Sequence, residues 1–66
     1  MSNALMGQRL RDLRGDKSRN EVAKAVGISL SALTMYETGQ RIPRDQIKVK
    51  LADYYGKTVQ DLFFAS

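Results

Sequence analysis

RNEVAKAVGISLSALTMYET, residues 19–38, is the stretch that decides the fold. Within it, Ala23 stands four residues before Gly27, and apolar side chains recur at helical spacing at Val22, Val26, Ile28, Leu33 and Tyr36. The pattern predicts two short helices that meet at a tight turn, because glycine adopts the left-handed conformation that ends a helix at little cost. The second of these helices carries a face that its own core does not need.

Polar residues mark where the two helices begin and end. Ser18 precedes Glu21 by three positions, which is the spacing of a capping box, and Ser29 can cap the next helix in the same way. Gly27 and then Thr38-Gly39 end the two helices. The predicted ranges are 18–26 and 29–37.

Three further helices flank this pair. Apolar residues at i, i+4 and i+7 predict helices over about 4–14 and 44–55, and Pro43 fits the first turn of the latter. Thr58 with Asp61 caps a last short helix, 58–63. The predicted fold class is therefore all-α, a compact five-helix arrangement.

The chain length favours one domain over residues 1–66. Its opening residues 1–4 include Ser-Asn-Ala, which is typical of a cloning remnant, so this segment is expected to be either foreign or disordered and carries no predicted function.

Composition excludes several classes of protein. The chain has neither cysteine nor histidine, and it has no glycine-rich phosphate loop, so we expect no enzyme activity, no metal site and no cofactor. No stretch is long and apolar enough for a signal sequence or membrane helix, and a reducing, cytoplasmic location fits best. A formal net charge of +4 and a pI near 9.8 favour a polyanionic partner.

The helix predicted over 29–37 has an outward face that lacks charge. At about 100° per residue, with Leu33 taken as the inward direction, Glu37 and Leu30 lie on one flank and Tyr36 and Ser29 on the other. Four uncharged residues then point outward: Ser31, Thr34, Met35 and Thr38. Such a face is unusual for a merely solvated helix in so basic a protein.

At this point the chain resembles a known family, the lambda-repressor-like, XRE-type helix-turn-helix domains of phage and bacterial regulators. The resemblance is carried by four runs and covers about residues 5–64. They are Met6-Gly7-Gln8-Arg9-Leu10-Arg11-Asp12-Leu13-Arg14, the segment from Ser18 to Ser29, Tyr36-Glu37-Thr38-Gly39, and Leu51-Ala52-Asp53-Tyr54-Tyr55-Gly56.

The resemblance implies a five-helix bundle whose third helix, 29–37, enters the major groove of double-stranded DNA. It assigns the base-facing positions to Ser29, Leu30, Ser31, Thr34, Met35 and, with the outward face, Thr38. It assigns the phosphate-facing positions to Arg19, Gln40, Arg41 and Arg44. It also pairs Arg9 with Glu37, a structural contact that the helical wheel favours because Glu37 lies on the inner flank.

This sequence departs from the family pattern in three ways. The loop before Ser18 is about two residues shorter than usual, and position 19 is Arg where relatives often carry Gln, which strengthens phosphate attraction. The outward face also lacks Arg, Asn and Gln, so the strongest base contacts are unavailable. We therefore expect selectivity to rest on hydroxyl groups, on contacts of Leu30 and Met35 with thymine methyls, and on DNA shape.

Two functions fit these residues. One is a sequence-specific DNA-binding transcriptional regulator, favoured as a repressor, that binds as a homodimer. The other is an antitoxin or co-regulator whose main partner is a protein. The three large apolar residues near the end of the chain either close the bundle or form a dimer surface: Leu62, Phe63 and Phe64.

Overall fold

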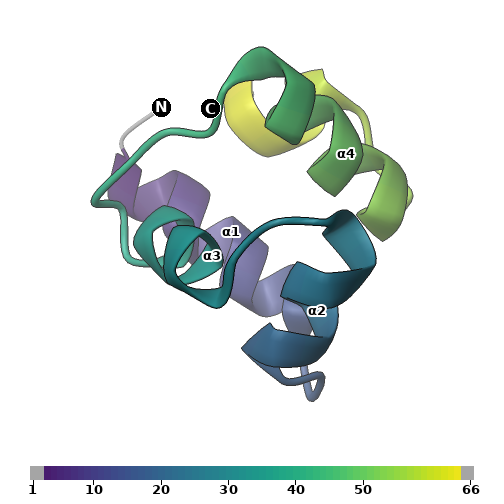
Figure 1. Cartoon of the computed structure of the whole chain (residues 1–66). Coiled ribbons are helices and arrows are strands. Elements are labelled where there is room, and N and C mark those ends of the chain that lie inside the picture. The colour runs from purple at the N-terminus through teal and green to yellow at the C-terminus, as the bar shows by residue number, and fades with distance from the viewer. Residues whose placement is uncertain (1–2, 65–66) are drawn as a thin grey trace.

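Helices account for all the regular structure in residues 3–64, which are the residues that the computed structural model describes. They are α1 (Asn3–Arg14), α2 (Arg19–Val26), α3 (Leu30–Glu37), α4 (Asp45–Tyr55) and η1 (Gln60–Phe64). The predicted all-α, five-helix fold is confirmed (Figure 1). In the opening segment, which was expected to be either foreign or disordered, Asn3 and Ala4 are ordered as part of α1, and residues 1–2 lie outside the described part of the chain.

Side-chain caps fix where α2 and α3 begin. The Ser18 Oγ accepts a hydrogen bond from the Glu21 N–H at 3.0 Å, and the Ser29 Oγ accepts one from the Ala32 N–H at 3.0 Å. Each cap satisfies an N–H that has no partner within its helix. Gly27 ends α2 with φ of +85° and donates its N–H to the Ala23 carbonyl at 2.8 Å. The predicted turn between the two helices is therefore present.

The last two helices differ from prediction in detail. Pro43 is buried and lies before the cap residue Arg44, so the first turn of α4 starts only at Asp45. The final element is a short π-helical turn instead of an α-helix, although the Thr58 Oγ1 accepts from the Asp61 N–H at 3.0 Å as predicted. The wider turn sends two apolar side chains inward and one outward.

One core holds the helices together. α1 packs against α3 and η1, while α2 packs against α3 and α4, so α3 is packed between α1 and α2 (Figure 1). Among residues 3–64, no helix combines the length and the apolar character that a bilayer span requires. The core consists of Met6, Leu10, Val22, Ala23, Val26, Leu33, Tyr36, Leu51, Ala52, Leu62 and Phe63.

Residues 62–64 separate the two roles predicted for the apolar residues near the end of the chain. Leu62 is 3% exposed and Phe63 is 7% exposed, because both close the core from η1. They are therefore unavailable as a dimer surface on this fold. Phe64, at 56% exposed, is the one residue of the predicted trio that faces outward.

The helices α1 and α3 approach each other closely at Gly7. A Cβ atom built at this position would lie 2.3 Å from the Glu37 carbonyl oxygen and 3.1 Å from that of Tyr36. Both contacts are with backbone, which cannot swing aside as a flexible side chain can. Gly7 therefore lets α1 lie directly on the last turn of α3, a role that the sequence did not suggest.

This contact makes a prediction about Gly7→Ala. Helix propensity alone would stabilise the variant by about 1 kcal/mol, since alanine is the better helix former. We expect instead a destabilisation of about 2 kcal/mol or more, because the added methyl group overlaps the Glu37 carbonyl. Urea unfolding followed by circular dichroism measures the sign.

Gly27→Ala is the matched control, because its Cβ would meet nothing within 4 Å and only its positive φ is strained. It should lose about 1 kcal/mol. A Gly7→Ala variant more stable than the wild type would contradict the close approach.

Candidate nucleic-acid interface

The two faces of α3 have different surroundings. Its inner face consists of Leu33, Tyr36 and Glu37, all buried. Apolar packing and the Glu37 carboxylate thus fix the rotation of the helix about its own axis. The opposite face is left to solvent.

The predicted base-facing residues lie on that opposite face to different degrees. Ser29, Ser31 and Thr38 are exposed, and Leu30 is 48% exposed. Thr34 and Met35 are half-buried, so only part of each side chain is available to a partner. The face offers hydroxyl groups and apolar surface without charge.

The two threonines of this face already donate their hydroxyl protons within the helix. The Thr34 Oγ1 donates to the Leu30 carbonyl at 2.9 Å, and the Thr38 Oγ1 donates to the Thr34 carbonyl at 2.8 Å. A hydroxyl oxygen used in this way can still accept a hydrogen bond. Thr34 and Thr38 therefore present an acceptor and a methyl group.

The predicted phosphate-facing residues lie in two places. Arg19 is the first residue of α2, whereas Gln40, Arg41 and Arg44 follow α3 and are exposed. The Gln40 N–H donates to the Met35 carbonyl at 2.9 Å, which ties the loop to the last turn of α3. Basic side chains thus come both from the helix before α3 and from the loop after it.

A buried ion-pair cluster lies behind α3. The Glu37 side chain is fully buried, and its carboxylate accepts from the Arg14 Nε at 2.9 Å and from the Arg19 Nε at 2.8 Å. Arg11 donates through Nη1 to the Glu37 backbone carbonyl. The hydrogen bond to Glu37 raises the pKa of Arg14. Three arginines therefore converge on one acidic residue.

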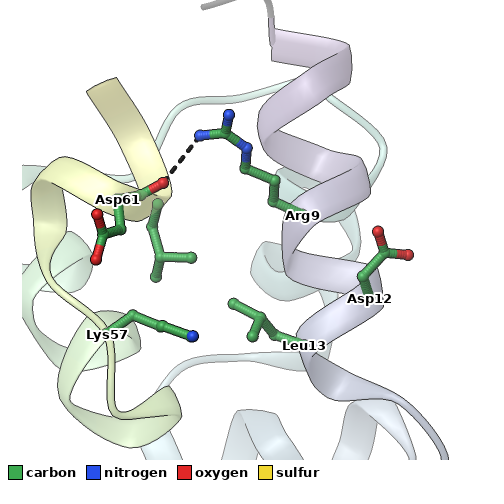
Figure 2. Close-up of a pocket in the computed structure, with 6 residues that line it drawn as sticks. Arg9, Asp12, Leu13, Lys57 and Asp61 are labelled. Atoms are coloured by element: carbon green, nitrogen blue, oxygen red, sulfur yellow. Dashed lines mark hydrogen bonds between the residues drawn. The ribbon is translucent and has the colours of Figure 1, made fainter. Parts of the chain in front are cut away.

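The cluster shows that the predicted Arg9–Glu37 pair was wrong. Arg9 donates instead to the Asp61 backbone carbonyl at 2.9 Å, across a pocket of about 280 Å³ between α1 and η1 (Figure 2). Arg9 and Arg14 are five positions apart, which separates them by about 140° around the helix. Of these two arginines, only Arg14 lies on the side of α1 that faces the Glu37 carboxylate.

Comparison with known proteins agrees with this geometry. The helix-turn-helix family matches residues 8–62 of the chain. The chain belongs to the helix-turn-helix family.

Individual helix-turn-helix relatives are regulators of several kinds. The transcriptional repressor RstR of a cryptic CTXphi phage from Vibrio cholerae is 32% identical over 60 residues, covering 88% of this chain and 54% of that protein. The chain thus spans about half the length of this curated relative.

Solved structures of this family superpose closely. The restriction-modification controller protein C.AhdI from Aeromonas hydrophila is 33% identical, with a TM-score of 0.82 over 92% of this chain and 96% of that one. The SOS-response repressor LexA from Eubacterium rectale is 28% identical, with a TM-score of 0.85 over 92% of this chain and 67% of that one.

Arg14 and Tyr55 are among the residues beside the helix-turn-helix that were missed from the sequence. The Arg14 side chain forms an ion pair with Glu37. The signal for this pair in the sequence was the short loop after Arg14, since few residues separate Arg14 from the start of α2. Tyr55 lies at the end of α4, and its hydroxyl is buried with no hydrogen-bond partner among the described residues. Burial, with the negative charge of Glu37, raises the pKa of Tyr55 to about 12.

The shifted pKa of Tyr55 makes stability depend on pH in alkaline solution. The unfolded chain ionises this phenol near pH 10, while the folded chain holds it neutral to about pH 12. A pKa raised by folding contributes stability that is complete below pH 10 and is lost as the pH rises through 12. After allowance for the partial exposure of the ring, this loss is about 1 kcal/mol.

Tyr55→Phe should therefore be as stable as the wild type or slightly more stable below pH 10, since it also removes an unpartnered hydroxyl. Between pH 10 and 12 its advantage should grow by about 1 kcal/mol. Urea unfolding of both proteins over pH 8–11.5 measures the difference, in which other titrations cancel. A constant difference over this range would contradict the burial of the phenol.

Proposed function

We propose that this chain binds double-stranded DNA as a transcriptional regulator, with α3 in the major groove. The observation that carries the proposal is the arrangement of α3. It is held by buried groups on one side and flanked by basic residues, while its free face is uncharged. This is the arrangement that a recognition helix needs, because phosphate contacts set its position and the free face reads the bases.

The relatives support the direction of regulation. The Vibrio cholerae relative is a transcriptional repressor, and the Eubacterium rectale structure is of a repressor as well. We therefore place this chain as a repressor that acts on bacterial or phage DNA, in the cytoplasm. In this proposal Ser29, Leu30, Ser31, Thr34, Met35 and Thr38 face the bases, and Arg19, Gln40, Arg41 and Arg44 face phosphates.

Selection of bound sites from random duplex DNA tests this division of labour. For Thr34→Ala we expect altered base preference at one position of each half-site, because a methyl group and an acceptor are lost. For Arg41→Ala we expect all sequences to be weakened alike, with a salt slope that is flatter by about one per protomer. Identical behaviour of the two variants would contradict the assignment of Thr34 to the bases and of Arg41 to a phosphate.

The salt dependence of the wild type separates this proposal from a protein-interaction module. Three or four phosphate contacts per protomer correspond to a log–log slope of roughly −5 to −7 for a dimer. An affinity for duplex DNA that does not change with salt would favour an antitoxin or co-regulator whose main partner is a protein.

We also infer that the chain forms a two-fold dimer, with half-sites about one helical turn apart. Phe64 motivates this inference, since a large aromatic residue at 56% exposure stands next to the Lys48 ammonium, which lies 4.8 Å from its ring centroid. Aromatic side chains of this kind commonly anchor interfaces.

Sedimentation without DNA tests the dimer. Phe64→Ser should weaken self-association about 10-fold or more, while Leu30→Ser, a change at a similarly exposed apolar residue on α3, should leave it as it is. A wild-type protein that stays monomeric at high concentration would rule out the dimer in the absence of DNA.

A further inference from the structure

The cluster around Glu37 holds more positive charge than its carboxylate requires. Arg14 contacts both carboxylate oxygens through Nε, at 3.2 and 2.9 Å, and its Nη1 donates to the Lys17 carbonyl at 2.7 Å. Its side chain is 18% exposed. Arg14 alone is therefore a sufficient counterion, and it is committed to the interior of the fold.

Arg19 makes a different kind of contact with the same carboxylate. Its Nε donates to the Glu37 Oε1 at 2.8 Å, and its side chain is 33% exposed. A guanidinium has five N–H donors in one plane, so a bond through Nε leaves the four Nη hydrogens outside this ion pair. These form the edge that recognises phosphate oxygens in a bidentate manner.

We propose that Glu37 is a positioning residue for DNA binding, because it fixes Arg19 through Nε and directs the Nη edge toward a backbone phosphate. The inference rests on the proposed DNA-binding function and adds a role for a residue that itself stays buried. Holding a long side chain in place before binding reduces the entropy that must be lost on contact. A lysine at position 19 would have one ammonium to divide between carboxylate and phosphate.

The competing interpretation is that Arg19 is only a second counterion for a buried carboxylate. A lysine would serve as that counterion almost as well. Any effect of substituting Arg19 would then be a loss of stability, without the loss of a phosphate contact. The two interpretations therefore differ in what Arg19→Lys and Glu37→Gln do to one particular phosphate contact.

The experiment uses a duplex selected by the wild-type protein, in which each phosphate in turn is replaced by a neutral methylphosphonate. We expect one replacement per half-site to weaken wild-type binding about 10-fold through Arg19. The same replacement should have no effect on Arg19→Gln, which has already lost the contact. In Arg19→Lys the effect should fall to less than about 3-fold, although the charge is kept.

Glu37→Gln is the decisive variant, since Arg19 is unchanged in it. We expect the effect of that methylphosphonate to fall below about 3-fold here too. Arg44→Lys is the matched comparison, because Arg44 is exposed and makes no ion pair in the described part of the chain. The affinity of Arg44→Lys for DNA should fall by a smaller factor than the affinity of Arg19→Lys. Circular dichroism and thermal unfolding check that each variant is folded.

The outcomes separate the two proposals. A wild-type protein without salt-dependent binding to any duplex would overturn the proposed function itself. If the wild type binds, the inference is wrong when Glu37→Gln keeps the full methylphosphonate effect, and also when Arg19→Lys keeps both its affinity and that effect. Should Glu37→Gln fail to fold, the Arg19→Lys result decides on its own.

Discussion

The buried carboxylate of Glu37 is the constraint on which the rest of the structure depends. An unpaired charge in the interior costs several kcal/mol, so the last turn of α3 can be buried only where cations reach it. Arg14 comes from the end of α1 and Arg19 from the start of α2, and the side chain between them is fully buried. Three helix ends are thus held at one point.

Such a cluster specifies geometry more than it adds stability. Replacement of a buried ion pair by well-packed apolar residues is often neutral or stabilising, whereas removal of one partner costs about 3–5 kcal/mol. Here the cluster fixes the orientation of α3. With Glu37 pointed inward and Gly7 allowing α1 to touch its backbone, α3 has one rotation about its axis, and its uncharged face is turned outward.

The sequence predicted the helices well because their signals are local. Helix caps can be recognised from two or three neighbouring residues, as at Ser18, Ser29 and Thr58. Gly27 fits a left-handed turn because of its own conformational freedom. The family resemblance then placed α3 as the exposed helix. These inferences needed no knowledge of how the helices pack.

The misses around Glu37 and in the core concern contacts between helices. A helical wheel shows that Glu37 points inward, but it does not show how α1 is rotated against it, so Arg9 was predicted where Arg14 lies. Gly7 looked like an ordinary helix residue because its neighbour is a carbonyl 30 positions away. The apolar character of Leu62 fitted both a core and an interface, and only packing distinguishes them.

On the proposed function, the fixed orientation of α3 also sets the balance between affinity for DNA and selectivity among DNA sequences. Basic side chains beside α3 attract every phosphate alike, whereas its free face has no residue for a bidentate base contact, each of which is worth about 1–3 kcal/mol of discrimination. A single half-site therefore discriminates weakly between sequences. Two half-sites read by a dimer add their discrimination free energies, and DNA deformability contributes at positions that no side chain touches. For a DNA-binding dimer of the proposed kind, selectivity then comes largely from two-fold symmetry and DNA shape, and both depend on the fixed orientation of α3.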